Sequence, residues 1–206
     1  MVLQQQAEVK LWGKARPNAT VTVKTSWNGQ TYKFSSDGKG GWSLTVSTPV
    51  AGGPYKIIFN DGELLTLQNV LIGEVWFCSG QSNMEMPMGC FDRQPVRGAN
   101  DIIAKAKPST PIRMYTTDSK DGRWVRQFSK TPAEDCQGEW LENTPVNVSH
   151  ISAVSYYFAR YIQEVLEVPV GIVVSTWGGS RIEAWMSRES IKPFSSIDLS
   201  ILDNDA

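Results

Sequence analysis

Two short polar segments carry the residues that could perform acyl-transfer chemistry. Residues 79–86 have the sequence SGQSNMEM, and residues 176–185 have the sequence TWGGSRIEAW. Ser82 offers a hydroxyl nucleophile, and the adjacent Gly178 and Gly179 let backbone N–H groups approach a developing oxyanion. These residue types predict Ser82 as a nucleophile and the two glycines as oxyanion-hole candidates. The same residues also fit a structural alternative, in which Ser82 caps a helix and the glycines form a turn.

Motifs for other chemistries do not occur in the sequence. Met84 takes the place of the second glycine in the nucleophile elbow G-x-S-x-G, and neither glycine-rich phosphate-binding pattern is present. Cys78, Cys90 and Cys136 have no C-x-x-C spacing, and His150 is the single histidine, so no metal site is expected. We favour three free thiols over one disulfide with a buried thiol.

A parallel sheet must position the two polar segments. The apolar run at residues 71–78 predicts a central strand that is buried on both faces, and residues 111–115 and 168–175 predict two further strands. Between the last two strands, apolar residues recur at helical spacing after a Ser149 N-cap, which predicts an amphipathic helix. These apolar residues are Ile151, Val154, Phe158, Tyr161, Ile162, Val165 and Leu166. Because ligands of open α/β sheets bind at the carboxyl ends of the strands, both polar segments are expected at the site.

The chain divides into two predicted regions. Residues 1–69 contain short strand-like runs at 21–25, 42–46 and 55–59, separated by Asn-Gly, Asp-Gly and Gly-Gly-Pro turns, which predict a small antiparallel β-sandwich region. Residues 70–206 are expected to form an α/β domain, with an irregular surface segment at about 87–145.

Composition excludes several classes of partner. The 206 residues contain 20 Lys+Arg and 21 Asp+Glu, and this lack of basic excess argues against nucleic-acid binding. No apolar run approaches the roughly 20 residues that span a membrane, and residues 1–6 lack the charged and apolar regions of a signal peptide.

Two longer strings resemble motifs of one family. Residues 73–87 (GEVWFCSGQSNMEMP) and 175–185 (STWGGSRIEAW) resemble the first and second motifs of the sialate O-acetylesterase family, a branch of the SGNH hydrolases. Residues 1–5 look like part of the β-rich region that precedes the hydrolase domain in this family. The resemblance implies an SGNH-type, flavodoxin-like parallel-sheet domain, here incomplete, and removal of O-acetyl groups from sialic acids without metal or organic cofactor.

The resemblance also implies roles for individual residues. Ser82 becomes the nucleophile and its own N–H an oxyanion donor, with Gly178 or Gly179 as the second donor. The expected substrate is an O-acetylated carbohydrate. The residues expected to shape the loops or bind this substrate are Gln81, Asn83, Trp177 and Ser180. Trp177 and Trp185 fit a sugar-facing role and a core role equally, and Arg181 and Glu183 are expected to form a local ion pair.

Half of the family's catalytic machinery is missing from the chain. The third motif with its Asn and the D-x-x-H pair do not occur, and His150 has Asn147 three residues earlier instead of Asp. We therefore expect the N-terminal portion of a larger esterase, with the catalytic His on a further segment or a second chain. The full protein is expected in the periplasm, outside the cell or in lysosomes.

Three alternatives to this interpretation remain open. The enzyme could deacetylate acetylated xylan instead of sialic acid. The β-rich region and the eight Trp residues also fit a non-catalytic carbohydrate-binding fragment. The third alternative is a degenerate fragment without enzymatic activity.

Overall fold

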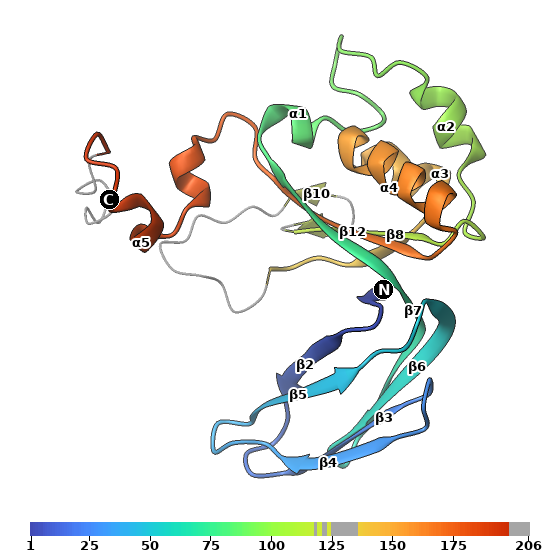
Figure 1. Ribbon diagram of the computed structural model, residues 1–206, viewed down its shortest axis with the longest axis vertical. Coiled ribbons are helices and arrows are strands. Elements are labelled where there is room, and N and C mark those ends of the chain that lie inside the picture. Colours follow the sequence, from blue (N-terminus) through green and yellow to red (C-terminus); the bar gives the residue numbers. More distant parts are fainter. Residues whose placement is uncertain (118, 121–122, 125–135, 198–206) are drawn as a thin grey trace.

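The computed structural model describes residues 1–117, 119–120, 123–124 and 136–197 (Figure 1). The strands are β1 (Val2–Gln4), β2 (Glu8–Lys14), β3 (Thr20–Thr25), β4 (Thr31–Ser35), β5 (Gly41–Ser47), β6 (Gly52–Asn60), β7 (Leu64–Gly80), β8 (Ile112–Thr116), β9 (Ser119–Lys120), β10 (Arg123–Trp124), β11 (Trp140–Glu142) and β12 (Val170–Thr176). The helices are α1 (Ser82–Glu85), α2 (Ala99–Lys105), α3 (Pro145–His150), α4 (Ala153–Leu166), the 3-10 helix η1 (Ile182–Trp185) and α5 (Arg188–Ile191).

The main sheet is mixed and has a parallel part. Its strand order is β11-β8-β12-β7-β6-β3-β4, with β1 also beside β7. Strand β12 pairs in parallel with both β7 and β8, while β11, β6, β3 and β4 pair antiparallel with their neighbours. Strands β2 and β5 form a separate antiparallel sheet. The predicted α/β class with parallel strands is therefore confirmed.

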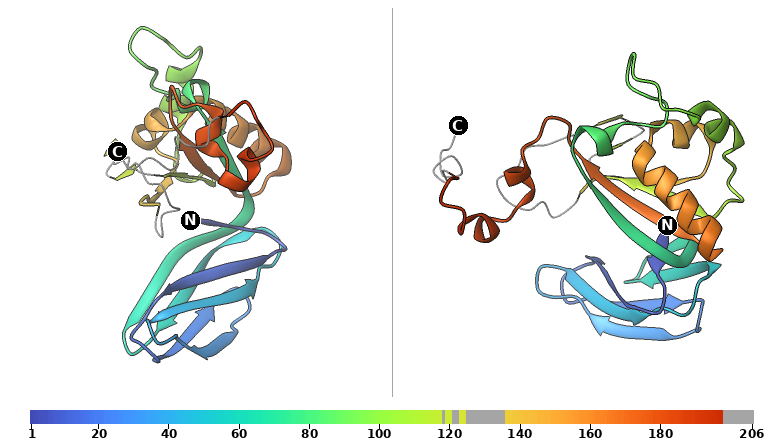
Figure 2. Two further views of the ribbon diagram at one scale, coloured as in Figure 1. Left: turned by 90° about the vertical axis from the view of Figure 1, so that its left-hand side faces the viewer. Right: turned by 45° about the horizontal axis from the view of Figure 1, so that its top comes forward.

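Strand β7 joins the two halves of the molecule (Figure 1). Its 17 residues continue through the predicted boundary between residues 69 and 70. The first half of β7 pairs antiparallel with β6, and residues 74–80 pair in parallel with β12. Figure 2 shows the β-rich half at one end of the molecule and the helices at the other.

Each half has its own apolar core. In the β-rich half, residues from both sheets pack together, including Leu11, Val23, Val46 and Ile57. In the other half, most of the buried residues come from β8, β12, α3 and α4, including Ile112, Met114, Tyr156 and Ile172. The helices α1 to α4 lie over one face of the parallel strands (Figures 1 and 2).

The apolar run at residues 71–78 is not buried on both faces, contrary to the prediction. Leu71 and Ile72 are buried, but Phe77 is 67% exposed and Trp76 is 42% exposed. Hydrophobicity alone cannot tell how many faces of a strand are covered. In the described part of the chain, helices cover one face only.

The predicted amphipathic helix differs in its start and in part of its buried face. A separate helix α3 ends at His150, and α4 is capped by Ser152, whose hydroxyl accepts a hydrogen bond from the Ser155 N–H at 3.3 Å. The buried residues of α4 are Ala153, Ser155, Tyr156 and Ala159, while Val154, Phe158, Tyr161, Val165 and Leu166 are exposed. Of the remaining predicted core residues, Ile151 is buried and Ile162 packs against the core. The buried face of α4 thus combines Tyr156 with three small residues, which allow close approach of the helix.

The segment predicted to be irregular, residues 87–145, contains α2 and the strands β8 to β11. The described residues leave out parts of two predictions. These parts are residues 118, 121–122 and 125–135 of the irregular segment and residues 198–206 of the second predicted region. No helix in the described ranges is long and apolar enough to cross a membrane.

Candidate active site

Parallel pairing brings the two polar segments together. Ser79 of β7 pairs with Ser175 of β12, and Gly80 pairs with Thr176, so both strands end at the same edge of the sheet. The Trp177 N–H then donates to the Gly80 carbonyl at 3.1 Å, which keeps the two loops adjacent. The predicted position of both segments at the carboxyl ends of the strands agrees with this geometry.

Ser82 is the first residue of helix α1 and is exposed. Its hydroxyl donates to Gln81 Oε1 at 2.8 Å, and its N–H donates to the same oxygen at 3.2 Å. Gln81, not Ser82, is the N-cap residue. The alternative interpretation of Ser82 as the cap is therefore wrong, because the longer Gln81 side chain reaches the first N–H of the helix.

The turn before Ser82 requires a glycine. Gly80 has φ +154°, and a Cβ at this position would lie 2.7 Å from Met84 Cγ. Met84 therefore packs closely against the backbone of the turn and leaves no room for a side chain at position 80.

Gly178 lies beside Ser82. A Cβ built on Gly178 would lie 3.5 Å from Ser82 Oγ and 2.7 Å from Glu85 Oε2. The Gly178 N–H donates to the Glu85 carboxylate. Sequence reasoning missed Glu85, although its position three residues after Ser82 places both side chains on neighbouring parts of one helical turn.

Gly179 has a different environment. It adopts φ +76°, and the space where a Cβ would stand is open. The Ser180 N–H donates to the Trp177 carbonyl at 3.3 Å, so the two glycines also form a turn, as the structural alternative states. The choice between Gly178 and Gly179 as oxyanion donor stays a prediction.

The other predicted site residues surround this turn. Ser180 Oγ donates to the Trp177 carbonyl at 2.6 Å and accepts from Trp185 Nε1 at 2.8 Å. Ser180 therefore ties Trp185 to the loop. The expected ion pair is present, with Arg181 Nε 3.8 Å from Glu183 Oε2.

Within the described residues, neither Asn83 nor His150 forms a hydrogen bond with the Ser82 hydroxyl. Asn83 is exposed on α1, and His150 is exposed at the end of α3. Within the described ranges, Ser82 Oγ forms no hydrogen bond with a histidine or a carboxylate, and Gln81 is its hydrogen-bond partner. The structure thus places the predicted nucleophile next to a candidate oxyanion donor, but among the described residues no histidine or carboxylate forms a hydrogen bond with that nucleophile.

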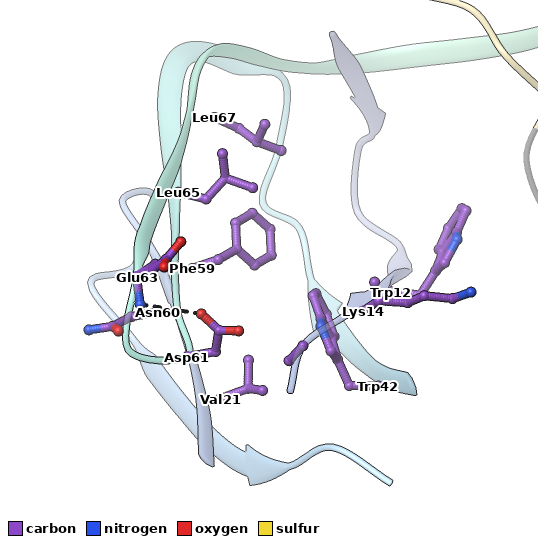
Figure 3. Close-up of a pocket in the computed structure, with 12 residues that line it drawn as sticks. Trp12, Lys14, Val21, Trp42, Phe59, Asn60, Asp61, Glu63, Leu65 and Leu67 are labelled. Atoms are coloured by element: carbon purple, nitrogen blue, oxygen red, sulfur yellow. Dashed lines mark hydrogen bonds between the residues drawn. The ribbon is translucent and has the colours of Figure 1, made fainter. Parts of the chain in front are cut away.

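A cavity of about 290 Å³ lies away from this site, in the β-rich half (Figure 3). Phe59, Leu65 and Leu67 point into it from β6 and β7, opposite Trp42 on β5 (Figure 3). Asn60, Asp61 and Glu63 add polar groups to its lining. This cavity therefore contains aromatic rings and hydrogen-bonding groups without any of the predicted catalytic residues.

Comparison with known proteins finds that the chain is similar to carbohydrate esterases. No protein-family model matches it. The chain is 30% identical to the sialate O-acetylesterases of Homo sapiens and Mus musculus, over 93% of its own length and 38% and 37% of theirs. The crystal structure of a carbohydrate acetylesterase from Xanthomonas citri superposes with a TM-score of 0.82 and 32% identity, over 99% of this chain and 43% of that one. The predicted resemblance is confirmed as homology, and the chain spans less than half the length of these relatives.

Proposed function

We propose that this chain, a homologue of the sialate O-acetylesterases, forms the nucleophile-bearing part of a carbohydrate O-acetylesterase of SGNH type, preceded by a β-sandwich region. One observation carries the proposal: Ser82 Oγ and Gly178 lie side by side at the ends of two adjacent parallel strands. This is where an acyl group attacked by Ser82 would meet backbone N–H donors.

The reaction is ester hydrolysis through an acetyl-enzyme. A base from outside residues 1–206 takes the Ser82 proton, and Ser82 Oγ attacks the acetyl carbonyl carbon. The tetrahedral intermediate expels the sugar oxygen, which takes this proton from the base and leaves as the sugar hydroxyl. Water then gives a proton to the same base and attacks the acetyl-serine carbonyl, and acetate leaves as the proton returns to Ser82 Oγ. The oxyanion accepts hydrogen bonds from the Ser82 N–H and from Gly178 or Gly179.

Both nearest N–H donors already have partners. Gln81 Oε1 accepts from Ser82, and Glu85 Oε2 accepts from Gly178. An oxyanion that binds here therefore replaces a side-chain oxygen as the acceptor of each N–H group. The N–H groups are thus hydrogen-bonded before substrate binds. The Gln81 side chain must move by the time the intermediate forms, and the Glu85 side chain must move as well if Gly178 is the second donor.

Acetylated sialic acid is the first-choice substrate, because the curated relatives are named for it. Acetylated xylan is the alternative, since the Xanthomonas citri relative is described only as a carbohydrate acetylesterase. We place the complete enzyme in the periplasm, outside the cell or in lysosomes, where acetylated glycans are met.

A non-catalytic carbohydrate-binding role is the second candidate. The cavity in Figure 3 favours it, because Trp42 and Phe59 line a concave surface with hydrogen-bonding groups. In that case Ser82 would have no chemical role.

The test uses a chimera of this chain and the Xanthomonas citri acetylesterase. In the chimera, this chain replaces the part of the acetylesterase that it matches, and the rest of the acetylesterase keeps its own order. A fluorophosphonate probe should label this chimera, and the Ser82→Ala chimera should stay unlabelled. Acetate release from O-acetylated sialic acid and from acetylated xylan identifies the substrate. A folded chimera that binds these glycans without labelling or acetate release would contradict the esterase and favour the binding role.

A further inference from the structure

We propose that the cavity in the β-rich half binds one neutral pyranose unit of a polysaccharide, with Asp61 as acceptor for its hydroxyls and Trp12 as a platform for the neighbouring unit. The cavity lies between strands β2 and β5 on one side and β6 and β7 on the other (Figure 3). Binding there uses neither Ser82 nor a base. The site therefore goes beyond the proposed esterase and does not depend on its chemistry.

The Trp42 ring forms a fixed wall of the cavity. Trp42 pairs across its sheet with Gly13, and a Cβ on Gly13 would lie 2.7 Å from Trp42 Cζ2, so the ring rests on the β2 backbone. The ring centroids of Phe34 and Phe59 each lie 5.6 Å from that of Trp42. A sugar ring packs its C–H groups on such an aromatic surface, and a wall that is already ordered loses little entropy on binding.

Asp61 supplies a charged hydrogen-bond acceptor to the cavity. Its carboxylate points toward the Trp42 side (Figure 3). Oδ1 accepts from the Glu63 N–H at 3.3 Å, and among the described residues Oδ2 has no hydrogen-bond partner. The Arg16 guanidinium donates to the Asp61 carbonyl at 3.1 Å, which holds this turn in place. Sugar hydroxyls can therefore donate to a positioned carboxylate, a stronger acceptor than a neutral group.

The charges of the lining favour a neutral sugar over an acidic one. Among the described residues, the charged side chains that line the cavity are those of Lys14, Asp61 and Glu63, with one more negative than positive charge. The carboxylate of a sialic acid would lie near two like charges, whereas a neutral pyranose offers hydroxyl donors. The volume of about 290 Å³ is close to the lower limit of small-molecule sites, roughly 300 Å³, and suits a single ring.

Trp12 and Leu65 lie at the open side of the cavity. Trp12 is 71% exposed and Leu65 is 61% exposed. Leu65 points into the cavity from β7, while the Trp12 ring lies at its rim on β2 (Figure 3). An exposed aromatic ring at the rim gives the next sugar unit a surface on which to stack. The rim therefore favours a polymeric ligand over a free monosaccharide.

The distance along β7 also favours a polymer. Leu65 lies near the start of this strand and Ser82 follows its end. A strand rises about 3.3 Å per residue, so the two positions are at most roughly 60 Å apart. A single sugar cannot contact both sites, but one polysaccharide can hold an unmodified unit in the cavity and present an acetylated unit to Ser82. This last consequence depends on the proposed function, whereas binding in the cavity does not.

Calorimetric titration of the 206-residue chain with xylotetraose and cellotetraose, two neutral pyranose oligomers, tests the site. Each should bind at least about tenfold more tightly than N-acetylneuraminic acid, because the lining is negative. Asp61→Asn should weaken binding at least about fivefold, since the charged acceptor becomes neutral. Trp12→Ala should also weaken binding. Leu65→Trp should abolish it, because the larger ring fills the cavity.

Three variants are controls that should bind like wild type. Leu64→Trp is matched to Leu65→Trp: Leu64 is 74% exposed, and neighbouring residues of a strand point to opposite faces, so the new ring lies outside the cavity. Asp92→Asn, with a side chain that is 96% exposed, is matched to Asp61→Asn. Ser82→Ala changes the candidate active site alone. Urea unfolding shows that each variant is folded.

Any of four results would overturn the cavity site. The first is a folded wild-type chain that binds neither oligomer at millimolar concentrations. The second is an equal loss of binding in Leu64→Trp and Leu65→Trp. The third is tighter binding of N-acetylneuraminic acid than of the neutral oligomers. The fourth is binding that survives Leu65→Trp but is lost in Ser82→Ala, which places the glycan at the candidate active site.

Failure of the proposed function has a different signature. In that case the chimera releases no acetate and takes no fluorophosphonate label, while both oligomers still bind to the 206-residue chain and Leu65→Trp still abolishes this binding. Such a result contradicts the esterase alone and supports the cavity site.

Discussion

The backbone N–H of Gly178 donates a hydrogen bond to the carboxylate of Glu85, beside the hydroxyl of Ser82. This bond joins the loop after β12 to the short helix after β7, across 93 residues of sequence. A carboxylate is a strong acceptor for a backbone N–H, so the bond also holds the loop after β12 and helix α1 in fixed positions relative to each other.

Replacing Glu85 should loosen this part of the site. Glu85→Ala removes the acceptor and should lower the free energy of unfolding by about 1–3 kcal/mol, with a smaller loss for Glu85→Gln, which keeps a neutral acceptor. Urea unfolding measures the change. Glu63→Ala, in an exposed turn of the β-rich half, is the control and should stay within about 0.5 kcal/mol of wild type. Equal losses for Glu85→Ala and Glu63→Ala would show that the bond has no energetic role.

The 206-residue chain by itself should hydrolyse p-nitrophenyl acetate hardly faster than buffer. A serine hydroxyl without a base is a weak nucleophile at neutral pH, and His150 is exposed on α3. Ser82→Ala and His150→Ala should therefore leave the rate unchanged. Rapid turnover that disappears with Ser82→Ala would require a base that this structure does not place at Ser82.

Tyr156 should make stability depend on pH in the alkaline range. Its hydroxyl donates to Asn143 Oδ1 at 2.6 Å, and both residues are buried. Burial raises the pKa of Tyr156 above 10, so the unfolded chain loses this proton first and stability falls as the pH rises above 10. Tyr156→Phe should lower the free energy of unfolding by about 1–3 kcal/mol at pH 8, because Asn143 loses its hydrogen-bond partner.

The difference in free energy of unfolding between wild type and Tyr156→Phe should decrease as the pH rises above 10, since phenylalanine does not titrate. Tyr157→Phe is the matched control on the same helix, where the hydroxyl donates to the Arg97 carbonyl at the surface. Urea unfolding at several pH values measures both variants. A Tyr156→Phe penalty that does not change with pH would contradict the raised pKa.

The three cysteines should react at different rates with a thiol reagent at pH 8. All three are free, and Cys90 and Cys136 are exposed, while Cys78 is half-buried beneath α4. Burial raises the pKa of Cys78 above its usual value, which lowers its thiolate fraction. We expect two fast phases and one slower by at least about tenfold. Cys78→Ser should remove the slow phase only, and loss of a fast phase in this variant would reverse the assignment.

Strands β8 and β12 and helix α4 show which features of the fold local sequence patterns predict. The runs at residues 111–115 and 168–175 predict β8 and β12 closely, because a buried parallel strand needs a continuous apolar stretch. The helix before β12 is predicted with the wrong cap, and its buried face is predicted only in part, since Ile151 and Ile162 contribute to the core. The other large apolar residues of the prediction are exposed, whereas Tyr156 is buried beside Ala153, Ser155 and Ala159.

The sequence by itself determined which residues follow each strand, and therefore that Ser82 and the Gly178–Gly179 pair would meet at one edge of a parallel sheet. It also determined that His150 is the single histidine available as a base. Only the tertiary structure decided that Gln81 and Glu85 accept the hydrogen bonds of the predicted oxyanion donors, and that Trp76 and Phe77 are exposed. The physical reason is that periodicity and motifs record neighbours along the chain, whereas burial and hydrogen-bond partners depend on which distant segment packs against them.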